Sequence, residues 1–187
     1  DWQKEAEKRG LSNNKNTPEA LKIKIAPKTI ALYEGLKVMN KVEIEARYEI
    51  EIEEYVHIIQ IEGRSLGDIA RNHVIPTAVK YQNILIDNVK GLKDIFGNDF
   101  KKYASEQLVL IADISQRIEA INSGVTTMTN ERKKANAITD TTKKATVYCN
   151  QVKPLFDDIR YHCDKLELLI DDELWPLAKY RELLFTK

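Results

Sequence analysis

The stretch 138–170, ITDTTKKATVYCNQVKPLFDDIRYHCDKLELLI, decides the fold class of this 187-residue chain. Positions spaced alternately four and three residues apart along it are apolar with one polar exception. They are Ile138, Thr142, Ala145, Cys149, Val152, Phe156, Ile159, Cys163, Leu166 and Ile170. Such heptads are typical of a long helix paired with another helix. Pro154 falls inside the run, where it predicts a kink or a local irregularity.

The same spacing occurs in the stretch that precedes this one. It runs through Phe100, Ala104, Gln107, Ile111, Ile114, Ile118, Ile121, Val125 and Met128, and only Gln107 is polar. Thr139 and Asp140 provide a helix cap between the two runs. We therefore expect two long helices in an antiparallel hairpin, joined by a tight turn and packed against the segment 41–96.

Residues 42–52 alternate between apolar and charged side chains, which is the pattern of a strand. The same stretch also fits a helix with an apolar stripe through Ile44, Tyr48, Ile52, Tyr55 and Ile59. No turn-forming cluster interrupts residues 41–62, and a strand of that length is far outside the usual range. The sequence therefore predicts a helix, with Asn40 before it as a helix stop or a cap.

Two features further along leave the course of this helix open. Pro76 is compatible with one long helix kinked there or with two successive helices. Apolar side chains at helical spacing continue beyond it to Phe96. The triplet Gly97-Asn98-Asp99 then predicts a clean helix end, with Asn or Asp capping the helix that follows.

Short helices are expected at the N-terminal end. Residues 1–9 have the composition of a charged helix that Gly10 terminates. Because this start lacks an initiator Met and resembles a helix interior, we expect the chain to be part of a longer protein. Thr17-Pro18 predicts an N-cap followed by proline in the first helical position, and Pro27 opens another short helix.

At the C-terminal end, Trp175-Pro176-Leu177 predicts a sharp turn, and residues 180–185 predict a short apolar docking helix. The predicted fold is all-α, an elongated antiparallel bundle of long helices with short N-terminal helices and a short C-terminal helix. We expect residues 1–40 to form the short linking helices and residues 41–187 to form the long-helix bundle.

Composition limits the possible functions. The 29 basic residues equal the 29 acidic ones, so no overall field favours binding to a nucleic acid. No apolar stretch approaches the roughly 20 residues that span a bilayer, and no signal peptide is apparent. Cys149 and Cys163 would lie about 21 Å apart on one helix, too far for a disulfide. We therefore expect reduced thiols and a cytoplasmic protein.

Glu54 and His57 share one helix face and have the Glu-x-x-His spacing of di-iron bundles. Such a site needs a second pair and two further carboxylates. Neither His73 nor His162 follows a Glu at that spacing, and Asp158 to His162 is only a distorted substitute. A helix-surface pair is therefore the favoured interpretation, with a metal site as its alternative.

Three other groups of residues resemble sites only superficially. Six glutamates between Glu43 and Glu54 are distributed around their helix, which favours a solvated face or an intersubunit contact. His162 and Cys163 diverge by about 100° on a helix, too far for a nucleophilic dyad. The segment 64–68 lacks the glycines and the Lys-Ser/Thr pair of a P-loop. We predict no catalytic, cofactor-binding or metal residue in this chain.

Across its whole length the chain resembles the C-terminal region of type III glutamine synthetases. The resemblance is carried by long matching segments: 5–13 (EAEKRGLSN), 60–64 (QIEGR), 70–73 (ARNH), 81–83 (YQN), 148–154 (YCNQVKP), 159–167 (IRYHCDKLE), 171–176 (DDELWP) and 179–185 (KYRELLF). No catalytic motif of that family matches a position in this chain.

The resemblance implies a parent enzyme that joins ammonia to glutamate at the expense of ATP, with Mg²⁺ or Mn²⁺. It places the active site in an upstream catalytic domain and implies a homo-oligomer, a dodecamer of stacked hexameric rings. This chain would then be a structural or assembly module without an active site. The alternative is a stand-alone helical binding module, possibly metal-binding, and the metal content of the purified chain discriminates between the two.

Overall fold

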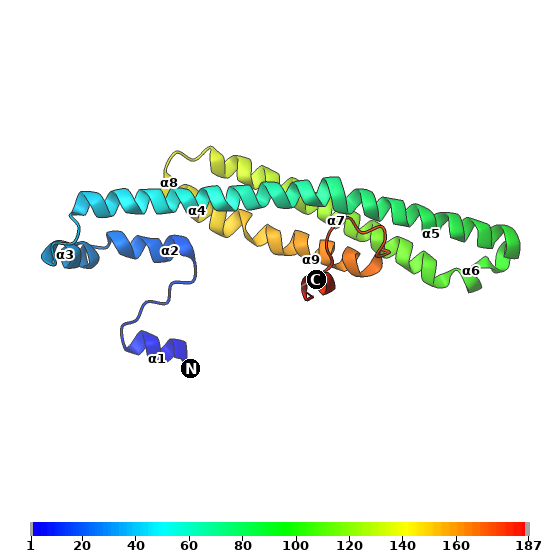
Figure 1. Cartoon of the computed structure of the whole chain (residues 1–187), viewed down its shortest axis with the longest axis horizontal. Coiled ribbons are helices and arrows are strands. Elements are labelled where there is room, and N and C mark those ends of the chain that lie inside the picture. The colour runs from blue at the N-terminus through cyan, green and yellow to red at the C-terminus, as the bar shows by residue number, and fades with distance from the viewer. Residues whose placement is uncertain (1, 186–187) are drawn as a thin grey trace. The chain divides into compact units, whose positions relative to one another are not determined.

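The computed structural model describes residues 2–185, with the side chain of Tyr180 excepted (Figure 1). Its described residues form helices and connecting segments and no strand, so the predicted all-α class is confirmed. The α-helices are α1 (Trp2–Lys8), α2 (Thr17–Lys22), α3 (Pro27–Gly35), α4 (Lys41–Ile69), α5 (Ile75–Phe96), α6 (Phe100–Tyr103), α7 (Ser105–Asn136), α8 (Thr141–Val147), α9 (Pro154–Leu169) and α10 (Tyr180–Leu183).

The chain divides into two compact units, which are described separately. The first unit contains the described residues up to Ile61 together with Glu131–Lys153, and the second contains Glu62–Asn130 and the described residues from Pro154 onward. The core of the first unit includes Ile44, Tyr48, Ile52, Tyr55, Val56, Ile59, Ala135, Ala145, Tyr148 and Val152. The core of the second includes Ala70, Val74, Ala78, Ala104, Ile114, Ile121, Val125, Met128, Ile159, Leu166, Ile170 and Trp175.

Helix α4 confirms the helical interpretation of the alternating stretch. Its predicted stripe is buried throughout, whereas Val42 and Ile50, which a strand would bury beside Ile44 and Ile52, are 74% and 64% exposed. Asn40, predicted as either a helix stop or a cap, caps α4, because its Oδ1 accepts a hydrogen bond from the Glu43 N–H at 3.0 Å. The Glu43 carboxylate in turn accepts from the Asn40 N–H at 2.8 Å, which completes a capping box.

The chain stays helical through Pro76 and does not form two separate helices. A π-helical turn, Ala70–Val74, joins α4 directly to α5, and the Ile75 N–H donates to the Ala70 carbonyl five residues back. Proline has no N–H, and its ring clashes with the carbonyl four residues before it. The wider turn that precedes Pro76 lets the helix continue through the proline.

Pro154 is accommodated in the same way, which confirms the predicted local irregularity. The π-helical turn Tyr148–Val152 separates α8 from α9, and the Lys153 N–H donates to the Tyr148 carbonyl at 2.9 Å. Asp140 caps α8 as predicted, accepting from the Lys143 N–H at 2.7 Å. Both predicted apolar runs are buried or half-buried at every position, so the two seams are confirmed.

The first of these runs is not a single helix, however. Helix α5 ends at Phe96 as predicted and is followed by the 3-10 turn Gly97–Asp99, in which Gly97 has φ of 57°. Neither Asn98 nor Asp99 caps the next helix through a side-chain bond, which corrects that prediction. The chain then forms α6, breaks at Ala104 and continues as α7.

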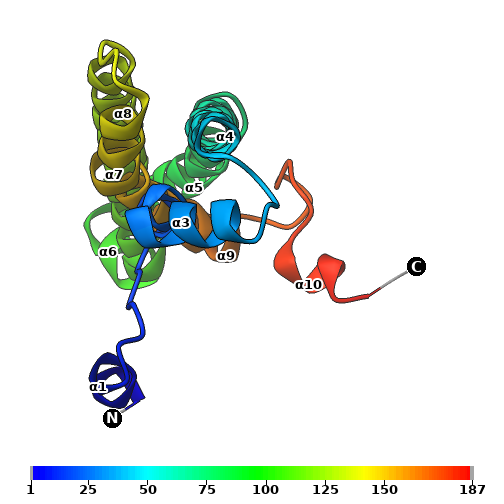
Figure 2. The ribbon, with the colours of Figure 1, turned by 90° about the vertical axis from the view of Figure 1, so that its left-hand side faces the viewer.

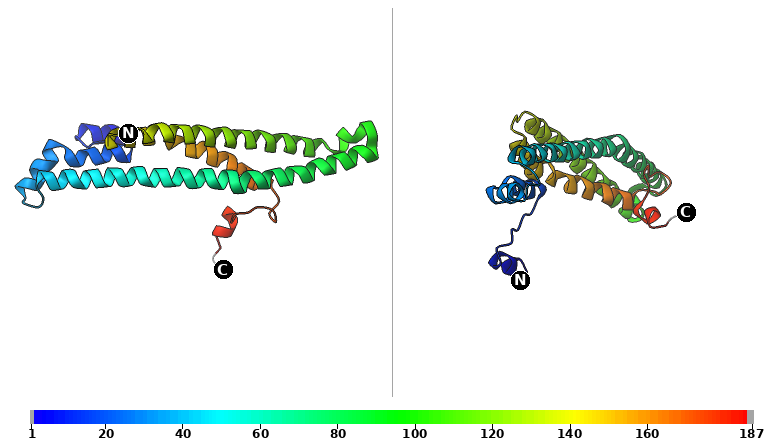
Figure 3. Two further views of the ribbon diagram at one scale, coloured as in Figure 1. Left: turned by 90° about the horizontal axis from the view of Figure 1, so that it is seen from above. Right: turned by 60° about the vertical axis from the view of Figure 1, so that its left-hand side comes forward.

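Contacts within each unit confirm the antiparallel pairing. In the first unit the Tyr148 hydroxyl donates to Asn136 Oδ1 at 2.7 Å across the α7–α8 turn. In the second unit α5 and α7 run in opposite directions (Figure 3), and the Gln82 side chain bonds to the Ile111 carbonyl at 2.9 Å. Helix α9 approaches α7 so closely that a Cβ added to Gly124 would lie 2.8 Å from Ile159 Cγ1.

At the N-terminal end the predicted short helices form, with one correction. The N-cap of α2 is Asn16 and not Thr17, because Asn16 Oδ1 accepts from the Glu19 N–H at 2.9 Å. Leu32 of α3 and Leu36, the residue that follows α3, are 59% and 65% exposed. Helix α2 lies against α8 within the first unit.

Candidate functional site

Glu54 and His57 lie on the outer side of α4, and both are exposed. Their distorted counterpart on α9 places His162 Nε2 3.9 Å from Asp158 Oδ1, a spacing of one helical turn. Neither pair gains further metal-ligand side chains, and the described residues contain no group of three His, Cys, Asp or Glu that could hold a metal ion. Nothing in the described residues supports the metal-binding alternative.

The glutamates of α4 are distributed around the helix and engage local partners. Glu43 belongs to the capping box. Glu45 lies 3.7 Å from Lys41 Nζ, and Glu51 lies 2.5 Å from Lys24 Nζ of the 3-10 turn Ile23–Ile25. These carboxylates therefore form surface ion pairs and do not converge on one point.

The side chain of Cys163 is half-buried on α9, one residue after His162. Burial, assisted by the neighbouring Asp164 carboxylate, raises the pKa of its thiol from 9.0 to about 11. A thiol with such a pKa is protonated at neutral pH, the opposite of what a nucleophile requires. Both Cys149 and Cys163 are free thiols, as predicted.

The segment 64–68 lies inside α4 and is not a loop. Gly67 within this segment and Gly63 just before it permit close packing and do not form a phosphate-binding loop. A Cβ on Gly63 would lie 3.0 Å from Phe156 Cζ, and one on Gly67 would lie 3.3 Å from Met128 Cε.

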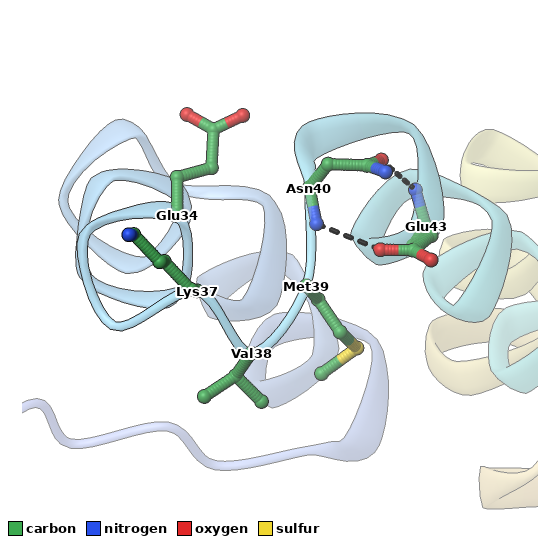
Figure 4. Close-up of a pocket in the computed structure, with 6 residues that line it drawn as sticks. All are labelled: Glu34, Lys37, Val38, Met39, Asn40 and Glu43. Atoms are coloured by element: carbon green, nitrogen blue, oxygen red, sulfur yellow. Dashed lines mark hydrogen bonds between the residues drawn. The ribbon is translucent and has the colours of Figure 1, made fainter.

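A hollow of about 470 Å³ lies where α3 meets α4 (Figure 4). It is lined by Glu34, Lys37, Val38, Met39, Asn40 and Glu43. Glu34 accepts a hydrogen bond from the Lys41 N–H at 3.0 Å, and Glu43 is engaged by Asn40. Both carboxylates thus accept bonds from backbone N–H groups, and among the described residues they belong to no group of three metal-ligand side chains.

A polar cluster with several hydrogen bonds surrounds Lys179, which is 8% exposed. Its ammonium donates to the Glu167 carbonyl at 2.8 Å, to the Ile170 carbonyl at 3.2 Å and to the Asp172 carboxylate. The first acceptor belongs to the last turn of α9 and the second to the residue that follows this helix, and a cation is favourable at such a C-terminal end. Arg181 also pairs with Asp172.

These bonds lower the pKa of the Asp172 carboxyl below its usual value, chiefly through the hydrogen bond from Lys179. A hollow of about 230 Å³ beside the cluster is lined by Glu167, Leu168, Asp172, Lys179 and Arg181. The arrangement fastens the start of α10 to the end of α9. Sequence reasoning missed it, because nothing in the spacing of Lys179 indicates that its ammonium turns back onto α9.

The fastened segment differs from the predicted docking helix. Helix α10 forms, but Leu183, Leu184 and Phe185 are 68%, 79% and 75% exposed. The prediction that these side chains dock is therefore wrong for this chain on its own. Apolar side chains are thus exposed at both ends of the chain, where a partner could cover them. The described residues contain no catalytic constellation.

Comparison with known proteins places these features in a family. A family model described as the glutamine synthetase C-terminal domain matches residues 1–93. The chain is 44% identical over 188 residues to "Glutamine synthetase" of Bacteroides fragilis (strain YCH46) and 30% identical over 194 residues to "Type-3 glutamine synthetase" of Dictyostelium discoideum. It is 26% identical over 186 residues to "Glutamine synthetase" of Butyrivibrio fibrisolvens.

Each of these alignments includes 100% of this chain but 26% of the relative. The chain thus spans about a quarter of the length of the curated relatives that it matches. No described helix is both long and apolar enough to cross a membrane. The family match and the alignments over the whole of this chain show that the chain belongs to the family of glutamine synthetase C-terminal domains.

Proposed function

We propose that this chain is the C-terminal helical module of a type III glutamine synthetase and that it serves assembly instead of catalysis. The observation that carries the proposal is the 44% identity to a glutamine synthetase over every residue of the chain. The complete enzyme would ligate ammonia to glutamate at the expense of ATP, in the cytoplasm.

ATP and Mg²⁺ or Mn²⁺ would be held by the catalytic part of that enzyme. The described residues of this chain do not fit them, because they contain no group of three metal-ligand side chains. A metal ion that stabilises transferring phosphates needs clustered carboxylate or histidine ligands. No step of the reaction is therefore assigned to residues of this chain.

The partners of the module would be the upstream catalytic domain and other copies of the enzyme. Residues 1–40 would link the long helices to the catalytic domain, and the whole would assemble as a dodecamer of stacked hexamers. Exposed apolar side chains support an assembly role, because apolar surface of this kind marks protein–protein contacts. Leu183, Leu184 and Phe185 form such a patch on the second unit, and Leu32 and Leu36 are exposed on the first.

Sedimentation of the complete protein, with and without residues 41–187, tests this assignment. We expect the complete protein to form glutamine and to sediment as a large oligomer, and we expect the truncated protein to form smaller particles. An unchanged oligomer after truncation would contradict the assembly role. One equivalent of a transition metal in the purified 187-residue chain would instead favour the metal-binding alternative.

A further inference from the structure

Helix α1 has a complete C-terminal cap. The Leu11 N–H donates to the Ala6 carbonyl at 2.9 Å and the Gly10 N–H to the Glu7 carbonyl at 2.9 Å. Together with the φ of +72° at Gly10, these bonds form a Schellman motif. Arg9 and Glu5 add an ion pair at 3.0 Å along the same helix. The local sequence thus specifies a helix with a defined end.

The same helix has no core of its own. None of the residues of α1 is buried, and Trp2 and Leu11 are 69% and 54% exposed. The exposed loop that follows leads away from α1 toward α2 (Figure 2). Helices shorter than about 12–15 residues are marginal in water unless they pack against something. A seven-residue helix that is well capped and unpacked therefore lacks its stabilising contact.

Trp2 and Ala6 are four residues apart and share one face of α1, and the Schellman motif brings Leu11 back against the end of the helix. Tryptophan has the largest apolar surface of any side chain. Exposing it at the first turn of an otherwise charged helix is unfavourable unless a partner covers it. The face made of Trp2, Ala6 and Leu11 is hereafter the Trp2 face.

We infer that the Trp2 face packs against the segment that immediately precedes residue 1 in the same polypeptide, and that this segment belongs to the catalytic part. This inference rests on the proposed function, which places a catalytic domain upstream. Three quarters of each relative's length lies outside the alignment with this chain, and the matching family is a C-terminal domain. A segment tethered directly to α1 has a high effective concentration at the Trp2 face, which favours it over a separate molecule.

Amide hydrogen exchange tests the inference by comparing the 187-residue chain with the complete synthetase. We expect the amides of α1 to exchange at least about tenfold more slowly in the complete protein, because docking suppresses local unfolding. In the complete protein, Trp2→Ser is expected to abolish that protection. The matched control Leu36→Ser changes the residue that follows α3, whose side chain is 65% exposed, and is expected to leave the protection of α1 unchanged.

Equal exchange of α1 in the two proteins, with α7 protected in both, would overturn the docking inference and leave the glutamine synthetase assignment intact. Protection that survives Trp2→Ser would overturn the role of the Trp2 face. Absence of glutamine formation by the complete protein would instead be a failure of the proposed function, so the two failures are distinguishable.

Discussion

At the scale of single residues, Gly124 sets how closely two helices of the second unit approach. A Cβ at this position would lie 2.8 Å from Cγ1 of Ile159, a side chain with no exposed surface. We expect Gly124→Ala to lower the free energy of unfolding by roughly 1–2 kcal/mol, because overpacking outweighs the gain in helix propensity.

The control for this substitution is Gly91→Ala. Gly91 lies in α5, and an added Cβ would meet no atom within 4 Å. We expect the free energy of unfolding of this variant to rise by about 0.5–1 kcal/mol, because alanine has a higher helix propensity than glycine. Urea denaturation of both variants measures the two free energies. A Gly124→Ala variant as stable as Gly91→Ala would contradict the close approach of α7 and α9.

Lys179 determines the position of the C-terminal segment. Replacing it by Met keeps the apolar stem but removes the ammonium that bonds to two carbonyls at the C-terminal end of α9 and to Asp172. We expect residues 171–183 to lose about 1–3 kcal/mol of local stability, since hydrogen bonds from charged groups in partly buried sites are strong. Hydrogen exchange of this segment provides the measurement.

Lys102→Met is the matched control for the Lys179 substitution. Lys102 lies 3.0 Å from Asp99, and both side chains are mostly exposed. Exposed pairs of this kind contribute at most about 1 kcal/mol, so little change is expected. If Lys179→Met exchanged no faster than Lys102→Met in the C-terminal segment, the fastening role of Lys179 would be wrong.

Cys163 makes a prediction about pH dependence. Two effects raise the pKa of its thiol from 9.0 to about 11, of which burial is the larger and the negative charge of Asp164 the smaller. At pH 8 the thiolate fraction is then about one in a thousand, roughly a hundredfold less than for the ordinary thiol. Iodoacetamide should therefore alkylate Cys163 about a hundredfold more slowly in the folded chain than in urea. The rate should rise as the pH approaches 11, and equal rates in both states would contradict its burial.

At the scale of elements, the capping box at the start of α4 combines two reciprocal hydrogen bonds, at 3.0 Å and 2.8 Å. We expect Asn40→Ala to destabilise the protein by about 1 kcal/mol, because both the cap and its reciprocal geometry are lost. Asn40→Asp retains an acceptor at the same place and should be nearly neutral. Thermal unfolding of the two variants checks this, and equal losses in both would argue against the cap.

The elements also show which features can be read from a sequence. The long helices were predictable because heptad spacing and burial have the same physical origin, and every position of the two runs is at least half-buried. The π-helical turns before Pro76 and Pro154 could not be predicted from the sequence. A proline requires only that the helix accommodate its missing N–H, and a kink, a break or a wider turn would each do so.

The break at Ala104 was also missed, because an apolar residue at a seam position looks the same whether the helix continues or restarts. The exposure of Leu183 and Phe185 could not be foreseen either. Apolarity predicts that a side chain will be buried, but not whether its own chain supplies the covering surface. The Lys179 cluster depends on a turn in the chain that carries no periodic signal.

At the scale of the whole molecule, this all-α chain belongs to a family of C-terminal domains and exposes apolar side chains at both ends. Its relatives are about four times as long, and they are named for an activity to which the described residues contribute no metal-ligand cluster. The central claim is therefore that the function belongs to a longer polypeptide of which this chain is a part.

Sequencing the coding DNA upstream of the codon for Asp1 is the decisive test. We expect an open reading frame that continues upstream for several hundred codons and encodes the glutamate and histidine metal ligands of a glutamine synthetase. A start codon immediately before Asp1, with no such frame, would contradict it and would make an independent helical binding module the better description.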